Sequence, residues 1–198
     1  MSNPKNKPAG EKLSTFQQVR DLPKKQAVAF SAGLLQRMLP NYVLFSEVCE
    51  FGDAEYAKKL LDLIWEWLLA PKSKINIAVQ LEKLEEITPD IENFDNYGVY
   101  PALDFCMAAT ACLQLICDEE ENGAVMVAKL SQGGVEAYLL ALSDVDLSNQ
   151  EIKADPLMQY EIEMQMELLS LCKQSSFKEL RKQIKELEMS NIGISLNN

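Results

Sequence analysis

Residues 102–117 are the most constraining feature of this sequence, because they carry only three polar side chains, Asp104, Thr110 and Gln114. A helix that is apolar nearly all round belongs in the interior of a fold. The run is shorter than the roughly 20 apolar residues that span a bilayer, and charged residues bound it on both sides. The sequence therefore predicts a buried central helix over about residues 101–117.

A turn leads into this helix. Residues 95–98 read Asp-Asn-Tyr-Gly, which favours a tight reversal because Asx side chains bond the nearby backbone and Gly98 tolerates positive φ. Pro101 suits the first turn of a helix, and it disfavours the α region for Tyr100. We therefore expect the central helix to begin at Pro101.

Helical spacing of apolar residues recurs along the rest of the chain. It predicts helices over residues 24–39, 42–50, 54–69, 76–87, 124–142 and 156–173, and a last helix after Ser176. Pro40 is expected to end the first of these, because proline lacks the N–H that an inner turn needs. Gly133 and Gly134 are expected to interrupt the helix around them, with a kink or a close helix contact.

We find no internal repeat and no convincing strand pattern. The expected fold is all-α: a single-domain, multi-helix bundle around the buried central helix. A chain of 198 residues is long enough to bury one sizeable core. Residues 1–12, with Pro4, Pro8 and several lysines, are expected to be a flexible leader, and residues 13–198 a single all-helical domain.

The charge of the chain is acidic and unevenly spread. The net charge is −11, and residues 26–175 hold nine Lys or Arg against 25 Asp or Glu. Such a body repels polyanions, so neither nucleic acid nor a membrane is expected as a partner. The five cysteines form no C-x-x-C pair, and the first 25 residues lack the apolar stretch of a signal peptide. We therefore expect a cytoplasmic protein.

The chain contains no histidine. This excludes Ser-His-Asp and Cys-His nucleophilic sites, His-ligated zinc and the Glu-x-x-His di-iron bundle. The sequence also has neither a P-loop nor a dinucleotide-binding glycine motif. No catalytic residue and no cofactor are therefore predicted.

Carboxylates offer the remaining route to an enzyme. Acids at helical spacing could hold Mg²⁺ or Mn²⁺ if facing helices brought them together, as in all-α nucleotide phosphohydrolases. The candidate ligands are Glu47, Glu50, Asp62, Glu66, Glu82, Glu85 and Glu86. Lys58, Lys59 and Lys83 lie among them, as is typical of a solvated helix surface. The solvated surface is the favoured interpretation, and the phosphohydrolase is the alternative.

Six residues are candidates for binding a ligand or a partner: Arg37, Asp53, Asp95, Tyr97, Tyr100 and Asp104. The two tyrosines could line a pocket with Asp95, because rigid amphipathic rings make good contact surfaces. A plug that seals the bundle, with both hydroxyls bonded to backbone, is favoured over that pocket. For Arg37, a structural clamp on carbonyls or on a carboxylate such as Glu47 is favoured over an anion site. Asp53 is placed to cap the helix that follows it.

Six short blocks of the sequence are distinctive. They begin at Arg37, Phe51, Leu61, Gln80, Tyr97 and Ser190, and they read RMLPNY, FGD, LDLIWE, QLEK, YGVYP and SNIGI. These blocks resemble the YjaG family, a bacterial family also called domain of unknown function 416. The resemblance runs in one register from about Val28 to Ile194. It implies an all-helical cytoplasmic protein, and it carries over no activity.

These observations favour a non-enzymatic module that binds an unknown protein partner or a small ligand. The absence of any complete catalytic set motivates this interpretation. A homodimer is one arrangement that such a module can take. The metal-dependent phosphohydrolase stays the alternative.

Overall fold

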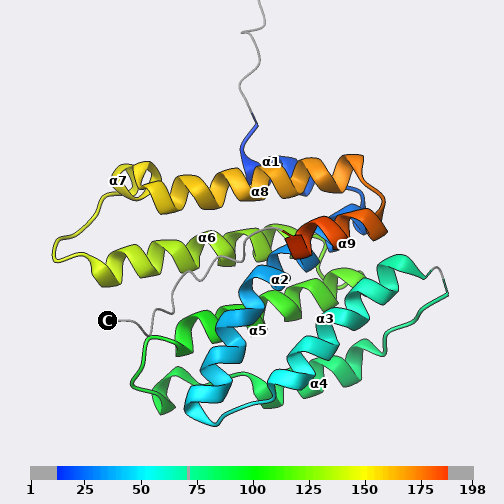
Figure 1. The fold of residues 1–198 in the computed structure, drawn as a ribbon, viewed down its shortest axis with the longest axis horizontal. Helices are drawn as coiled ribbons and strands as arrows, with labels where there is room; N and C mark the ends of the chain where they lie inside the picture. Colours follow the sequence, from blue (N-terminus) through cyan, green and yellow to red (C-terminus); the bar gives the residue numbers. More distant parts are fainter. Residues whose placement is uncertain (1–12, 71, 187–198) are drawn as a thin grey trace, which may run out of the picture.

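A computed structural model describes residues 13–70 and 72–186, which form an all-α fold without strands (Figure 1). The predicted fold class is therefore confirmed. The leader expected at residues 1–12 lies outside the described residues. In chain order the helices are α1 (Thr15–Arg20), α2 (Lys24–Cys49), α3 (Ala54–Leu69), α4 (Ile77–Ile87), the 3-10 helix η1 (Ile91–Asn93), α5 (Val99–Ile116), α6 (Gly123–Leu142), α7 (Asn149–Ala154), α8 (Pro156–Gln174) and α9 (Phe177–Glu186).

Helix α5 is the central helix that the apolar run predicts. It packs against α2, α4 and α6, and residues such as Phe105, Cys112 and Leu113 are fully buried. By length and composition α5 could cross a membrane, yet 61% of it is buried inside the fold. Its apolar composition follows from that burial. The helix begins at Val99, so Pro101 occupies the first turn, where an N–H has no helical partner.

Helix α2 shares the centre of the molecule with α5. It packs against α3, α5, α6, α8 and α9, and in Figure 1 it crosses the middle of the fold. The prediction of two helices divided at Pro40 is wrong, because α2 continues through Pro40. A proline inside a helix costs about 3 kcal/mol or more. Burial of Tyr42 and Phe45 in the turns beyond it offsets that cost.

Helix α6 also continues where the sequence predicted an interruption. Gly133 and Gly134 both lie within its single helical span. A Cβ built on Gly133 would have no atom within 4 Å, so no close helix contact requires this glycine. A Cβ on Gly134 would lie 3.4 Å from Oδ2 of Asp104, which is an ordinary contact. The glycine pair therefore creates open surface instead of a tight crossing.

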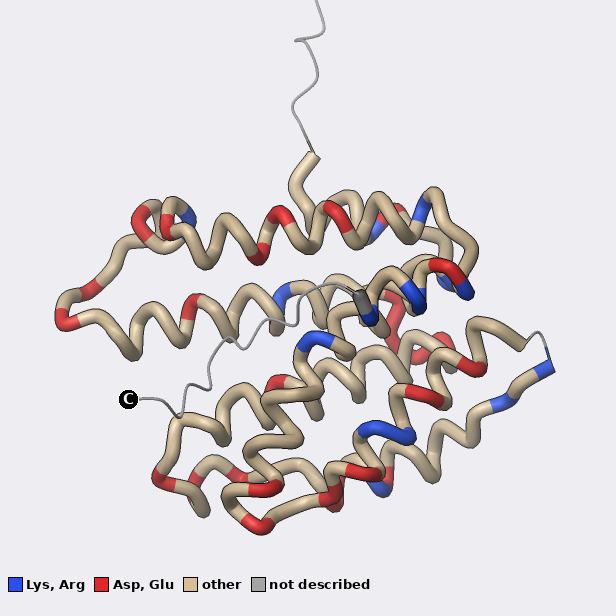
Figure 2. The backbone as a smooth tube through the Cα atoms, viewed as in Figure 1, with Lys and Arg blue, Asp and Glu red and all other residues tan. Residues whose placement is uncertain are grey.

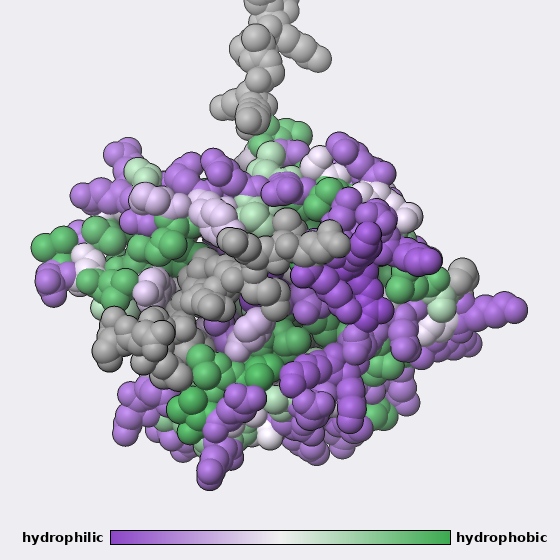
Figure 3. Space-filling model, viewed as in Figure 1, coloured by the Kyte–Doolittle hydropathy of each residue, from purple (hydrophilic) through white to green (hydrophobic). Residues whose placement is uncertain are grey.

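The helices surround one main core and one smaller apolar cluster. The main core involves α1 to α6, α8 and α9. The smaller cluster joins the second half of α6 to α7 and the start of α8 through Val135, Leu139, Ile152 and Met158. Exposed Leu142 and Val145 continue the apolar character at this end of the molecule, which Figure 3 shows as hydrophobic surface at its left edge.

Candidate functional site

Four of the six predicted binding residues line one cavity of about 50 Å³. They are Arg37 from α2 and Tyr97, Tyr100 and Asp104 from the turn before α5 and its first half. We call this cavity the Arg37 pocket. Its other lining residues come from α2, α5, α6 and α8: Met38, Asn41, Pro101, Leu130, Ser131, Gly134, Val135, Ala137 and Glu161.

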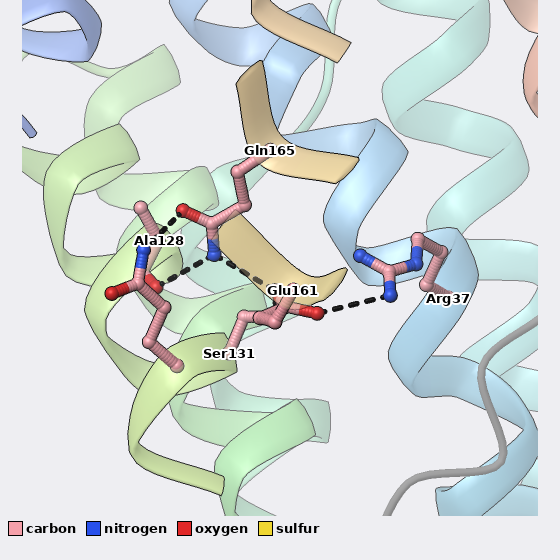
Figure 4. A network of polar contacts seen from close by, with 6 residues as sticks. Arg37, Ala128, Ser131, Glu161 and Gln165 are labelled. Atoms are coloured by element: carbon pink, nitrogen blue, oxygen red, sulfur yellow. Dashed lines mark hydrogen bonds and ion pairs between the residues drawn. The ribbon is translucent and has the colours of Figure 1, made fainter. Parts of the chain in front are cut away.

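The guanidinium of Arg37 is the most unusual group in this pocket. The side chain is only 7% exposed, and its Nη2 donates to Oε2 of Glu161 at 2.9 Å. Among the described residues, its Nε and Nη1 are buried without a hydrogen-bond partner. Figure 4 shows this hydrogen-bonded ion pair between Arg37 and Glu161 as a dashed line. Because a buried unsatisfied donor costs about 1–3 kcal/mol, and more when charged, the pocket contains unused binding capacity.

The carboxylate of Glu161, by contrast, is fully satisfied. It is 1% exposed, and its Oε1 accepts from the Ser131 hydroxyl at 2.5 Å and from Nε2 of Gln165 at 2.8 Å. Gln165 also donates to the Ala128 carbonyl at 3.1 Å, and its Oε1 accepts from Gln132 at 2.9 Å (Figure 4). This network joins α6 to α8 and holds Glu161 in place. A buried carboxylate so well bonded is a fixed partner for Arg37.

The sequence missed the partner of Arg37. Glu47 was named as a candidate partner, but the structure pairs Arg37 with Glu161, 124 residues away along the chain. A signal for Glu161 existed: it lies at helical spacing from Met158 and Leu168 on the buried side of α8. A charged residue within an apolar stripe indicates a buried ion pair. The structure thus gives Arg37 a buried carboxylate partner, and that partner is Glu161 instead of Glu47.

Asp104 supplies the second polar wall of the pocket. Its carboxylate has no hydrogen-bond partner among the described residues. Burial raises the pKa of Asp104 to about 6, because a partly buried carboxylate loses hydration when it ionises. The pocket therefore contains an acceptor as well as donors without protein partners.

Aromatic rings close the side of the pocket near the turn. Tyr97 lies with its ring centroid 5.7 Å from that of Tyr100 and 6.1 Å from that of Tyr138. Burial, with a contribution from the charge of Asp104, raises the pKa of Tyr97 to about 12. The plug interpretation expects the hydroxyls of Tyr97 and Tyr100 to bond backbone groups. Among the described residues, neither hydroxyl forms such a bond. With Tyr100 49% exposed, the rings form a wall at the mouth of the cavity.

The remaining two predicted residues lie elsewhere. Asp53 caps α3, since its carboxylate accepts from the backbone N–H of Tyr56 at 2.8 Å. Its own N–H donates to the Tyr42 hydroxyl at 3.4 Å, and that hydroxyl donates to the Ile87 carbonyl at 3.0 Å. Asp95 is exposed in the turn and does not line the Arg37 pocket. Asp53 therefore has a structural role at the junction of α2, α3 and α4.

The acids of the alternative interpretation do not form a site. All seven, Glu47, Glu50, Asp62, Glu66, Glu82, Glu85 and Glu86, are exposed. Asp62 instead forms an ion pair with Arg181 of α9. Figure 2 shows acidic positions spread along several helices. Within residues 13–70 and 72–186, no group of three or more His, Cys, Asp or Glu side chains could hold a metal ion. The geometry does not favour the phosphohydrolase.

Three buried cysteines have thiols of low reactivity. Burial raises the pKa values of Cys106, Cys112 and Cys172 to about 12. A thiol with so high a pKa stays protonated near neutral pH and is a poor nucleophile. These cysteines therefore act as small apolar residues of the core.

Comparison with known proteins supplies the family. The family model described as "Protein of unknown function (DUF416)" matches residues 14–195. The uncharacterized protein YjaG of Escherichia coli K12 is 38% identical over 176 residues, which cover 85% of this chain and 90% of that protein. An uncharacterized protein of Haemophilus influenzae is 33% identical and covers 90% of this chain and 95% of its own length.

A solved structure agrees in fold. The crystal structure of a DUF416 family protein from Shewanella baltica OS155 has a TM-score of 0.85 and 42% sequence identity to this chain. The match covers 93% of this chain and 100% of that one. Sequence and structure together therefore show that this chain belongs to the DUF416 family, whose function is unknown.

Proposed function

We propose that this protein is a non-enzymatic binding module that takes an acceptor group of its partner into the Arg37 pocket. The observation that carries the proposal is the state of the Arg37 guanidinium. The side chain is only 7% exposed, and two of its nitrogen atoms, Nε and Nη1, have no hydrogen-bond partner among the described residues. A neutral carbonyl oxygen from a partner would satisfy these donors. The gain is large because a buried charged donor binds an acceptor without first losing much hydration.

The fixed position of Arg37 also supports binding. Glu161 holds Nη2, and Glu161 is itself held by Ser131 and Gln165. A guanidinium already held in place loses little conformational entropy when a partner arrives. The pocket thus resembles a pre-formed binding site.

The size of the pocket limits what it can take. A cavity of about 50 Å³ has room for a few water molecules or one small polar group. A whole nucleotide is several times larger, so the pocket does not support the phosphohydrolase. One carbonyl group at the end or side of a larger partner fits the space.

The chain offers a direct test, because it contains only three arginines, Arg20, Arg37 and Arg181. Their Nε–H groups give separate signals in a ¹H–¹⁵N NMR spectrum of the full chain, and arginine-to-lysine variants assign them. We would titrate the protein with acetamide and with N-acetyl amino acid amides, which are neutral acceptors. The expected result is a saturable shift of the Arg37 signal, while Arg20, which is exposed and lies outside the pocket, stays constant. If no probe shifts Arg37 selectively, the pocket does not bind acceptors and the proposal fails.

A further inference from the structure

An open apolar groove between α5 and α6 begins where the Arg37 pocket ends. The groove has a volume of about 480 Å³, and it shares Tyr100, Asp104, Leu130 and Ala137 with the pocket. Its other lining residues are Leu103, Met107, Met126, Lys129 and Gly133. Pocket and groove therefore form one continuous surface, with Asp104 between the polar and the apolar part.

The groove exposes large apolar side chains. Tyr100 is 49%, Met107 47% and Met126 39% exposed. Neighbouring exposed apolar side chains that line one groove indicate a contact surface, whereas scattered ones do not. Methionine is flexible and polarizable, so two methionines can adapt to more than one bound side chain.

Gly133 is an exposed residue that lines this groove. It lies in the interior of α6, where a glycine destabilises a helix by about 0.8–1 kcal/mol relative to alanine. A Cβ at this position would meet no atom within 4 Å, so a close contact at the Cβ position does not explain the glycine. The missing side chain instead leaves room for something outside the chain.

We propose that the Arg37 pocket and this groove together bind a peptide segment of a partner protein. A backbone carbonyl of the peptide accepts from Arg37, a backbone N–H donates to Asp104, and a neighbouring apolar side chain lies between Met107 and Met126. This inference rests on the proposed function and specifies the class of partner. It uses the two buried Arg37 nitrogens without partners and the partly exposed carboxylate of Asp104.

The charges of the site favour a peptide over a fatty acid. A fatty acid would place its carboxylate between one cation, Arg37, and two acids, Glu161 and Asp104, which line the same pocket. Arg37 is already paired with Glu161, so the added negative charge would face Asp104 uncompensated. A peptide unit is neutral and presents both an acceptor and a donor. It therefore complements the site without adding charge.

The test starts from a phage-displayed library of random dodecapeptides, selected against the immobilised full-length protein. Enriched sequences would be synthesised, and their Kd would be measured on the wild type, Gly133→Leu and Gly133→Ala. Gly133 lines the groove but not the Arg37 pocket, so the leucine adds bulk on the groove side, whereas the alanine adds one carbon atom to open space. Both variants should raise Tm by roughly 2–4 °C, because each restores helix propensity. Loss of binding by Gly133→Leu would thus not reflect unfolding.

The expected result is enrichment of peptides with apolar residues that bind Gly133→Leu roughly tenfold more weakly than Gly133→Ala. If peptides enrich but bind both variants equally, the groove is not their site and this inference fails. The inference also fails if no peptide enriches. It fails as well if oleate shifts the Arg37 signal in the NMR titration and the peptides do not. The proposed function is tested separately, because a shift of the Arg37 signal by small acceptors does not depend on the groove.

Discussion

A single ion pair decides the character of the candidate site. Arg37 and Glu161 are 7% and 1% exposed, and removing one partner of such a pair usually destabilises a protein by about 3–5 kcal/mol. The carboxylate has a full set of donors, while the guanidinium has two donors left over. The pair therefore stabilises the fold through its carboxylate, and it leaves two buried guanidinium nitrogens without a protein partner.

Asp104 gives a pH-dependent prediction at the same scale. Its pKa of about 6 in the folded protein lies above the ordinary aspartate value, 3.8. Between these values the folded state holds a proton that the unfolded chain has released, so stability falls as pH rises through this window and is constant above it. Asp104→Asn should match the wild type near pH 4. It should be more stable at pH 7 by about 1–2 kcal/mol, a figure reduced for solvent screening.

Urea unfolding of the wild type and Asp104→Asn across this pH range would measure the effect. Asp95→Asn, an exposed acid of the preceding turn, serves as the control and should follow the wild type at every pH. A stability difference between Asp104→Asn and the wild type that is the same at pH 4 and pH 7 would contradict the prediction.

At the scale of elements, the junction between α2 and α3 is tightly constrained. Gly52 has φ of +75°, and a Cβ there would lie 2.2 Å from the Tyr42 hydroxyl oxygen. This hydroxyl bonds both the Ile87 carbonyl and the Asp53 N–H, so it links the ends of α2, α3 and α4. Gly52 is therefore required by backbone conformation and by packing.

Gly52→Ala should destabilise the protein by about 2–4 kcal/mol, from left-handed backbone strain and displacement of the Tyr42 hydroxyl. Denaturant unfolding measures the loss. Gly133→Ala is the matched control and should stabilise, since an alanine Cβ there meets no neighbour. Equal effects of the two substitutions would show that the Gly52 turn can relax.

The observed helix bounds show which helices can be predicted from local sequence patterns. The bounds predicted for α3 and α4 are close to those observed, because Asp53 and Asn76 cap helices with clear apolar stripes. Helices α1 and α7 were missed, although Ser14 and Ser148 both begin capping boxes. Each has only six residues, which is too short for a periodic pattern to emerge.

At the scale of the whole molecule, the spread of acids gives a prediction about metals. The seven candidate ligands are exposed, and no metal-binding group forms among the described residues. A site filled at 100 times its Kd would stabilise the protein by about 2.7 kcal/mol, which raises Tm by several degrees. We expect no such rise when millimolar Mg²⁺ or Mn²⁺ is added to chelator-treated protein in a thermal unfolding experiment. A rise of several degrees would restore the phosphohydrolase as a candidate.

The sequence by itself determined the fold class and the buried central helix, and it placed Tyr97, Tyr100 and Asp104 at the start of that helix. Apolar periodicity, caps and the turn before α5 are encoded within a few neighbouring residues, so they can be read locally. The tyrosines and Asp104 come together for this reason: residues 97–104 span the turn and the first half of α5.

The tertiary structure alone decided how α2, α5, α6 and α8 meet. Packing energy carried α2 through Pro40 against its local preference, and it brought Glu161 to Arg37 across 124 residues of sequence. It also gave Gly133 an open groove instead of a helix crossing. These contacts depend on the simultaneous burial of several helix faces, and no short stretch of sequence contains that information.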